Sequence, residues 1–135
     1  PLYPDVNTSV RNPIDTGIAA ADPNVIIKTA KILDQDENID IVFLYMPAHW
    51  LKMYGGALGE TFITSLGRSF GRIFRKMSSL FVVISPIFVV NGVVARISTK
   101  FREALNEANV LCFSGVKNAA NTLRKILDYT KFHNK

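Results

Sequence analysis

Two kinds of segment follow one another along this chain: segments with apolar residues at helical spacing, and short runs of consecutive apolar residues. Residues 22–33 carry apolar side chains at helical spacing, with Asp22 placed to cap the helix and Pro23 suited to its first turn. The polar stretch 34–38 ends this helix. Residues 39–45 then form an apolar run rich in β-branched and aromatic residues, which predicts a strand covered on both faces.

A second helix is predicted over residues 57–74. Its apolar positions step by four and form one stripe: Leu58, Phe62, Leu66, Phe70 and Phe74. The same segment contains Gly59, Gly67 and Gly71, each of which weakens a helix by up to about 1 kcal/mol. Small residues at such positions often mark close packing, so we expect this helix to lie tightly against another element.

The middle of the chain is less regular. Residues 80–85 predict a second buried strand, which Pro86 should end. Residues 87–95 fit either a continued strand or a loop with a turn at Asn91–Gly92. Ser98 is predicted to cap a short helix that follows.

The last third of the chain completes the pattern. Residues 110–113 predict a third strand, and Ser114–Gly115 open a final helix. Helices and strands thus alternate, which predicts a single α/β domain with a parallel sheet, right-handed crossovers and helices on both faces. In such sheets ligands bind beyond the carboxyl ends of the strands, where helix amino termini favour anions. Three connections lead to that edge: 46–50, 86–92 and 114–115.

Composition narrows the function. The chain has 135 residues and a net charge of +5, a bias that suits an anionic ligand or partner surface and is too weak to indicate nucleic acid. The most apolar stretch, 80–97, is too short and too interrupted to span a membrane. Two distant histidines and one cysteine give no metal-ligand set. That cysteine, Cys112, lies in an apolar run, which favours a buried thiol over a nucleophile and suits a reducing, cytoplasmic compartment.

The turn from Asn12 to Gly17 is the strongest candidate for chemistry. Asn-Pro opens a turn, Asp15 can bond nearby backbone amides, and Gly17 permits a positive φ or the close approach of a ligand. Two interpretations stay open, an anion-holding turn and an ordinary structured turn. After the first strand, Ala48 and His49 lie in the next candidate loop. There His49 could serve as an acid–base group or as a cation for phosphate, or it could be a partly exposed loop histidine without a function.

Two ends of the chain carry a resemblance to a known family. Residues 9–17, followed by 26–45, resemble the start of the flavodoxin-like CoA-ligase domain of the ADP-forming acyl-CoA synthetases, relatives of succinyl-CoA synthetase. Residues 101–114 and the closing helix 119–129 resemble the end of that domain. On this basis residues 1–11 are an extended lead-in and 12–135 the domain itself, which we expect to be excised from a longer chain.

The resemblance implies one part of a multi-domain enzyme. The parent enzyme would convert acyl-CoA, ADP and phosphate to acid, ATP and CoA, with Mg, through an acyl phosphate and a phosphohistidine on another domain. This domain would bind no cofactor itself and would hold acyl substrate or phosphate beside the CoA-binding, His-bearing and ATP-grasp domains. The resemblance implies no catalytic residue in this domain. It implies that substrate or phosphate would be bound by Asn12, Asp15, Gly17, Ala48 and His49.

Other classes of function stay open beside this one. The chain could be a regulatory or interaction module of the same ancestry, such as the synthetase-like part of a protein acetyltransferase. It could also be a free-standing flavodoxin-like binding domain. A Ser/Thr-rich phosphate loop after the first strand is absent, which disfavours FMN. Asp40 opens its strand rather than ending it, which disfavours a response regulator.

Overall fold

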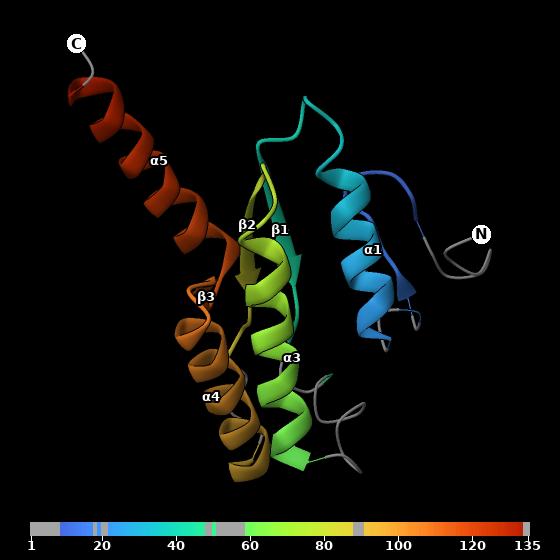
Figure 1. Cartoon of the computed structure of the whole chain (residues 1–135). Helices are drawn as coiled ribbons and strands as arrows, with labels where there is room; N and C mark the ends of the chain where they lie inside the picture. Colours follow the sequence, from blue (N-terminus) through green and yellow to red (C-terminus); the bar gives the residue numbers. More distant parts are fainter. Residues whose placement is uncertain are drawn as a thin grey trace.

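A computed structural model describes residues 9–17, 19, 22–47, 50, 59–87 and 91–133, with the backbone alone at residues 59 and 60. Within these residues helices and strands alternate along the chain (Figure 1). The elements are α1 (Pro23–Leu33), β1 (Ile41–Tyr45), α3 (Gly59–Phe74), β2 (Leu80–Ile84), α4 (Gly92–Glu107), β3 (Leu111–Phe113) and α5 (Val116–His133). This order confirms the predicted alternation of helix and strand.

The strands form a parallel sheet in the order β1-β2-β3. Tyr45 pairs with Ile84, and Ile84 pairs with Phe113, so the carboxyl ends of all three strands meet at one edge of the sheet. Helices cover both faces, which gives the predicted flavodoxin-like α/β domain. The parallel arrangement follows from the helical crossovers, because a helix must carry the chain back between parallel neighbours.

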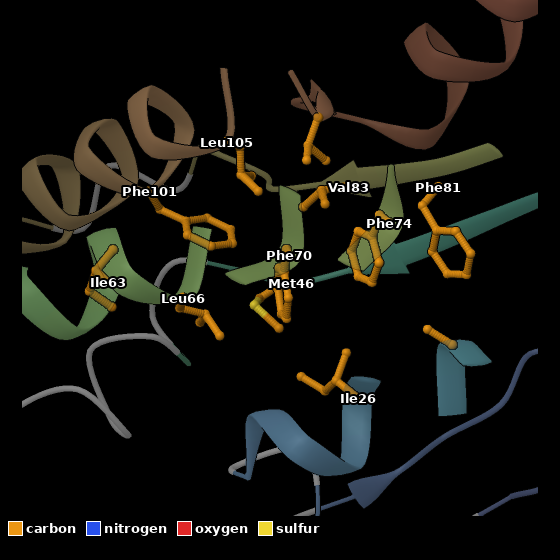
Figure 2. Close-up of a cluster of buried hydrophobic side chains, with 12 residues drawn as sticks. Ile26, Met46, Ile63, Leu66, Phe70, Phe74, Phe81, Val83, Phe101 and Leu105 are labelled. Atoms are coloured by element: carbon orange, nitrogen blue, oxygen red, sulfur yellow. The ribbon is translucent and has the colours of Figure 1, made fainter. Parts of the chain in front are cut away.

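One face of the sheet holds most of the core. Helices α1, α3 and α4 pack on this face around Phe70, which is fully buried (Figure 2). The Phe70 ring stacks on Phe74 with centroids 5.0 Å apart and meets Phe101 edge-on at 6.5 Å. Ile26 of α1 and Met46, which follows β1, join the same cluster. A cluster of this size is the main source of hydrophobic stabilisation in the described domain.

Two glycines let α3 and α4 approach closely, as the sequence predicted. A Cβ at Gly67 would lie 2.7 Å from the Ala104 Cβ. A Cβ at Gly71 would lie 2.8 Å from the Ala108 carbonyl oxygen. Both distances are too short for real carbon contacts, so the helices can be this close only without those side chains.

The opposite face is covered by α5 alone among the described elements. Ala119 and Leu123 of α5 are buried against Val82 and Ile84 of β2. From residue 124 onward every described residue of α5 is exposed. Figure 1 shows the reason, because this part of the helix leans away from the sheet and its carboxyl end stands clear of the body.

The expectation that β1 is covered on both faces is wrong for the described chain. Phe43 is 41% exposed and Tyr45 is 56% exposed. Both side chains point to the face of α5, which packs over β2 and β3 instead. An open groove of about 350 Å³ remains between α5 and β1, lined in part by Ile41, Phe43 and Leu127.

Helix starts show one correct prediction and one error. Asp22 caps α1 as expected, and its carboxylate accepts from the Asn24 amide at 2.9 Å. Ser98, in contrast, caps nothing, because α4 begins two turns earlier with Asn91 as its cap. The Asn91 side chain accepts from the amides of Val93 and Val94, so the suspected loop at Asn91–Gly92 is a helix start.

Candidate functional site

The turn from Asn12 to Gly17 has the local chemistry that its sequence predicted. Ser9 and Asp15 exchange two backbone hydrogen bonds, each 2.9 Å long, and so close the turn. The Gly17 amide donates to the Asp15 carboxylate at 2.9 Å, and Gly17 has a φ of 51°. The Asn12–Pro13 peptide bond is cis. Asp15 thus bonds within the turn through both its backbone and its carboxylate, as its sequence predicted.

This turn lies away from the sheet. Figures 1 and 2 both show α1 between the segment of residues 9–17 and the sheet, with this segment along the outer side of the helix. The Ser9–Asp15 pairing is an isolated bridge, and the described part of the lead-in adds no strand to the parallel sheet. Asn12 and Asp15 are exposed. Ala48 and His49, the other two predicted site residues, lie outside the described residues.

The carboxyl edge of the sheet is built as the fold class predicted. Backbone hydrogen bonds continue just past the strands, from the Met46 amide to Ile84 and from the Ser85 amide to Phe113, each 2.8 Å long. The connections that follow the three strands therefore begin side by side. Met46 and Ser85 are buried here, at the point where β1 and β2 end.

Ser85, Ser98 and Arg102 form a polar cluster at this edge that sequence reasoning missed. Ser85 follows β2 and is 0% exposed, and Ser98 lies within α4 and is 3% exposed. Neither hydroxyl has a hydrogen-bond partner within the described part of the chain. Arg102 donates from Nη1 to the Ser85 carbonyl at 3.2 Å, which ties α4 to the end of β2.

A sequence signal for this cluster existed. Ser98, Arg102 and Leu105 recur at the helical spacing of one buried face, which places the serine inside a helix rather than at its start. Ser85 follows Phe81 and Val83 at strand spacing, so its side chain shares their face of the sheet, the one that α3 and α4 cover. Both hydroxyls therefore lie between α4 and the end of β2.

Cys112 of β3 is half-buried beside the same cluster. Burial raises the pKa of the Cys112 thiol, and the positive charge of Arg102 opposes that rise. The thiol is thus less ionised than a free one at neutral pH, in keeping with the predicted unreactive cysteine.

Two classes of site have no support in the described part of the chain. No group of three or more histidine, cysteine or acidic side chains is placed to hold a metal ion there. Among the same residues, no helix combines the length and the apolar character needed to cross a membrane.

Comparisons with known proteins assign no family. A scan against protein-family models, a search of curated proteins and a search of solved structures each returned no match to this chain.

Proposed function

We propose that this chain is an accessory catalytic domain of an ADP-forming acyl-CoA synthetase. The observation that carries the proposal is the agreement between the resemblance and the fold. The sequence resembles that family's CoA-ligase domain at both ends, which implies a flavodoxin-like sheet, and the chain has such a sheet. The proposal assigns the domain to the cytoplasm, where CoA and ATP are used.

In this role the domain contributes a wall of a shared site. The chemistry, from acyl-CoA, ADP and phosphate to acid, ATP and CoA, would proceed through an acyl phosphate and a phosphohistidine on a neighbouring domain. The turn at residues 9–17 lies on the outer side of α1 (Figure 1), and Asn12 and Asp15 are exposed within it, so this turn is accessible to such a neighbour. The isolated domain would not turn over, because the CoA-binding, His-bearing and ATP-grasp parts belong elsewhere.

A second candidate is a regulatory or interaction module of the same ancestry. The exposed end of α5 favours it, since Tyr129 and Phe132 are large aromatic residues that are 64% and 77% exposed. Exposed aromatic residues are common in protein interfaces. A free-standing flavodoxin-like binding domain is the third reading of the same fold.

Reconstitution separates these functions. The chain would be mixed with the CoA-binding, His-bearing and ATP-grasp parts of its parent protein, and CoA-dependent ATP formation would be measured. The proposal predicts activity that requires the chain and falls at least about tenfold with Asn12→Ala, the loss expected from about 1.4 kcal/mol of transition-state stabilisation. An assay that proceeds equally well without the chain would instead support the interaction module. Activity that needs the chain and ignores Asn12→Ala would remove the turn from the site.

A further inference from the structure

Arg102 carries a positive charge that the described chain leaves unmatched. Its side chain is half-buried, yet the ion pairs of the described residues involve other groups: Arg68 with Glu107, Lys100 with Glu103 and Arg124 with Asp128. One N–H of Arg102 bonds the Ser85 carbonyl. A guanidinium has five N–H donors in a planar fork that suits a carboxylate or a phosphate. Donors of Arg102 therefore remain for an oxyanion.

Two buried hydroxyls accompany this charge. A buried hydroxyl without a hydrogen bond destabilises a fold, and among the described residues Ser85 and Ser98 each carry such a hydroxyl. An alanine would fill either position without that cost. Two such serines facing one interface therefore indicate hydroxyls kept for a ligand rather than for packing.

Helical spacing and one hydrogen bond relate the three residues. Ser98 precedes Arg102 by four residues, so the two lie one turn apart on the same face of α4. Long side chains on a helix point back toward its amino terminus, which directs Arg102 toward Ser98. Arg102 also bonds the backbone carbonyl of Ser85, which brings its guanidinium to the residue that carries the second unpaired hydroxyl.

The amino terminus of α4 is not the feature that makes this place a site. The Asn91 side chain already accepts from the amides of Val93 and Val94, so two of the free donors at the helix end are occupied. The donors of the proposed site belong to side chains instead: Ser98 and Arg102 farther along α4, and Ser85 after β2. They lie at the carboxyl end of β2, the edge at which α/β sheets bind their ligands.

We propose that Arg102, Ser85 and Ser98 form an oxyanion site for a phosphate or carboxylate group between α4 and the end of β2. The guanidinium supplies the charge and two of its N–H groups, and the hydroxyls donate to the remaining oxygens. This site is distinct from the Asn12–Gly17 turn, and it binds its ligand without other domains. It therefore goes beyond the proposed function and does not depend on it.

The test is a titration of the full chain with sodium phosphate near neutral pH, against sodium chloride at equal ionic strength. Calorimetry gives the affinity, and the thermal unfolding midpoint gives the stabilisation that ligand binding adds. Phosphate should raise the midpoint where chloride does not. Arg102→Gln should weaken phosphate binding at least about tenfold. Arg96→Gln removes the same charge from an exposed position of the same helix and should leave binding unchanged.

Substitution of the serines tests the site with variants that should not destabilise the fold. Ser85→Ala and Ser98→Ala should unfold at the same temperature as the parent chain or higher without phosphate, because each removes an unpaired buried hydroxyl. Each should weaken phosphate binding several-fold. Arg102→Lys keeps the charge but loses the fork, and should bind more weakly than the parent chain.

Acetate in place of phosphate identifies the class of ligand. A shift with either anion that disappears in Arg102→Gln supports the site, and the anion with the higher affinity names its ligand. Equal shifts with chloride, or equal losses in Arg96→Gln and Arg102→Gln, would overturn the proposal. Phosphate binding that persists while reconstitution fails would refute the synthetase role and leave the site intact.

Discussion

The two faces of the sheet are built very differently. On the face of α1, α3 and α4, Phe70 is fully buried within a cluster of buried residues, and glycines allow two helices to come into close contact. On the face of α5, Ala119 and Leu123 are the buried residues that the helix contributes, and Phe43 and Tyr45 stay exposed. Both faces belong to the same three strands, so the contrast comes from the helices.

This contrast separates two tasks. The first face holds the chain together and also contains Arg102 and the two buried hydroxyls, of Ser85 and Ser98, that have no partner among the described residues. The second face adds little to the described core and presents apolar surface instead, including Phe132 at 77% exposure. Stability and the proposed oxyanion site are therefore on one face, and the surface available for partners is on the other.

The largest expected loss of stability comes from a substitution in the core of the first face. Phe70→Ala should lower the free energy of unfolding by about 3–5 kcal/mol, because it removes a fully buried ring together with its contacts to Phe74 and Phe101. Chemical denaturation followed by circular dichroism measures it. A loss below about 1 kcal/mol would mean that the core is not centred on this residue.

The second prediction concerns the stability contributed by the α5 face, which has fewer buried residues. Leu123→Ala should cost about 2 kcal/mol, the low end for a buried leucine, since the adjoining groove lets water reach the vacated space. Leu127→Ala, one turn later on the same helix and about half exposed, is the matched control and should change stability by less than about 0.5 kcal/mol. Equal losses at both positions would show that α5 is packed along its full length.

The third prediction tests the contact between α3 and α4. Gly71→Ala should destabilise the domain by about 1–3 kcal/mol, because the added methyl group meets Ala108. An alanine in a helix is otherwise stabilising, so the sign of the effect is informative. Gly92→Ala places the same methyl group at the start of α4, where nothing lies within 4 Å, and should be neutral or stabilising. Thermal unfolding of the two variants decides whether the glycine is needed.

The smallest effect concerns Cys112. Because burial raises the pKa of its thiol, alkylation by iodoacetamide should be slower than that of a small free thiol and should accelerate with rising pH. Arg102→Gln should slow it further, since the positive charge that favours the thiolate is lost. Stability should decrease as pH rises above the ordinary pKa of a thiol, because the unfolded chain then releases the proton more readily. Rates that match a free thiol at every pH would contradict this account.

Much of the fold was predictable because its signals are local. Asp22 and Pro23 mark the start of α1, and the repeated aromatic residues of α3 give its buried stripe. The start of α4 was not, since Val93 and Val94 suit a strand and Gly92 suits a turn. The helix starts at Gly92 because the Asn91 side chain accepts from the amides of Val93 and Val94. The pattern of apolar residues around Asn91 does not predict these hydrogen bonds.

The two candidate sites show the same limit. The Asn12–Gly17 turn is encoded in consecutive residues, so its hydrogen bonds could be predicted. The Arg102 cluster joins residues 85 and 102, and its buried hydroxyls become evident only when α4 lies on β2. Likewise, Phe43 is exposed because α5 does not pack over it. The sequence pattern of β1 cannot predict where α5 packs.

Amide hydrogen exchange of the full chain, with and without phosphate, tests most directly whether the first face carries the binding edge. The account predicts slower exchange at the end of β2 and along residues 94–102 of α4, with no change in α5 or in the turn at residues 9–17. Protection that appears in that turn, or on α5, while α4 stays unchanged would contradict it.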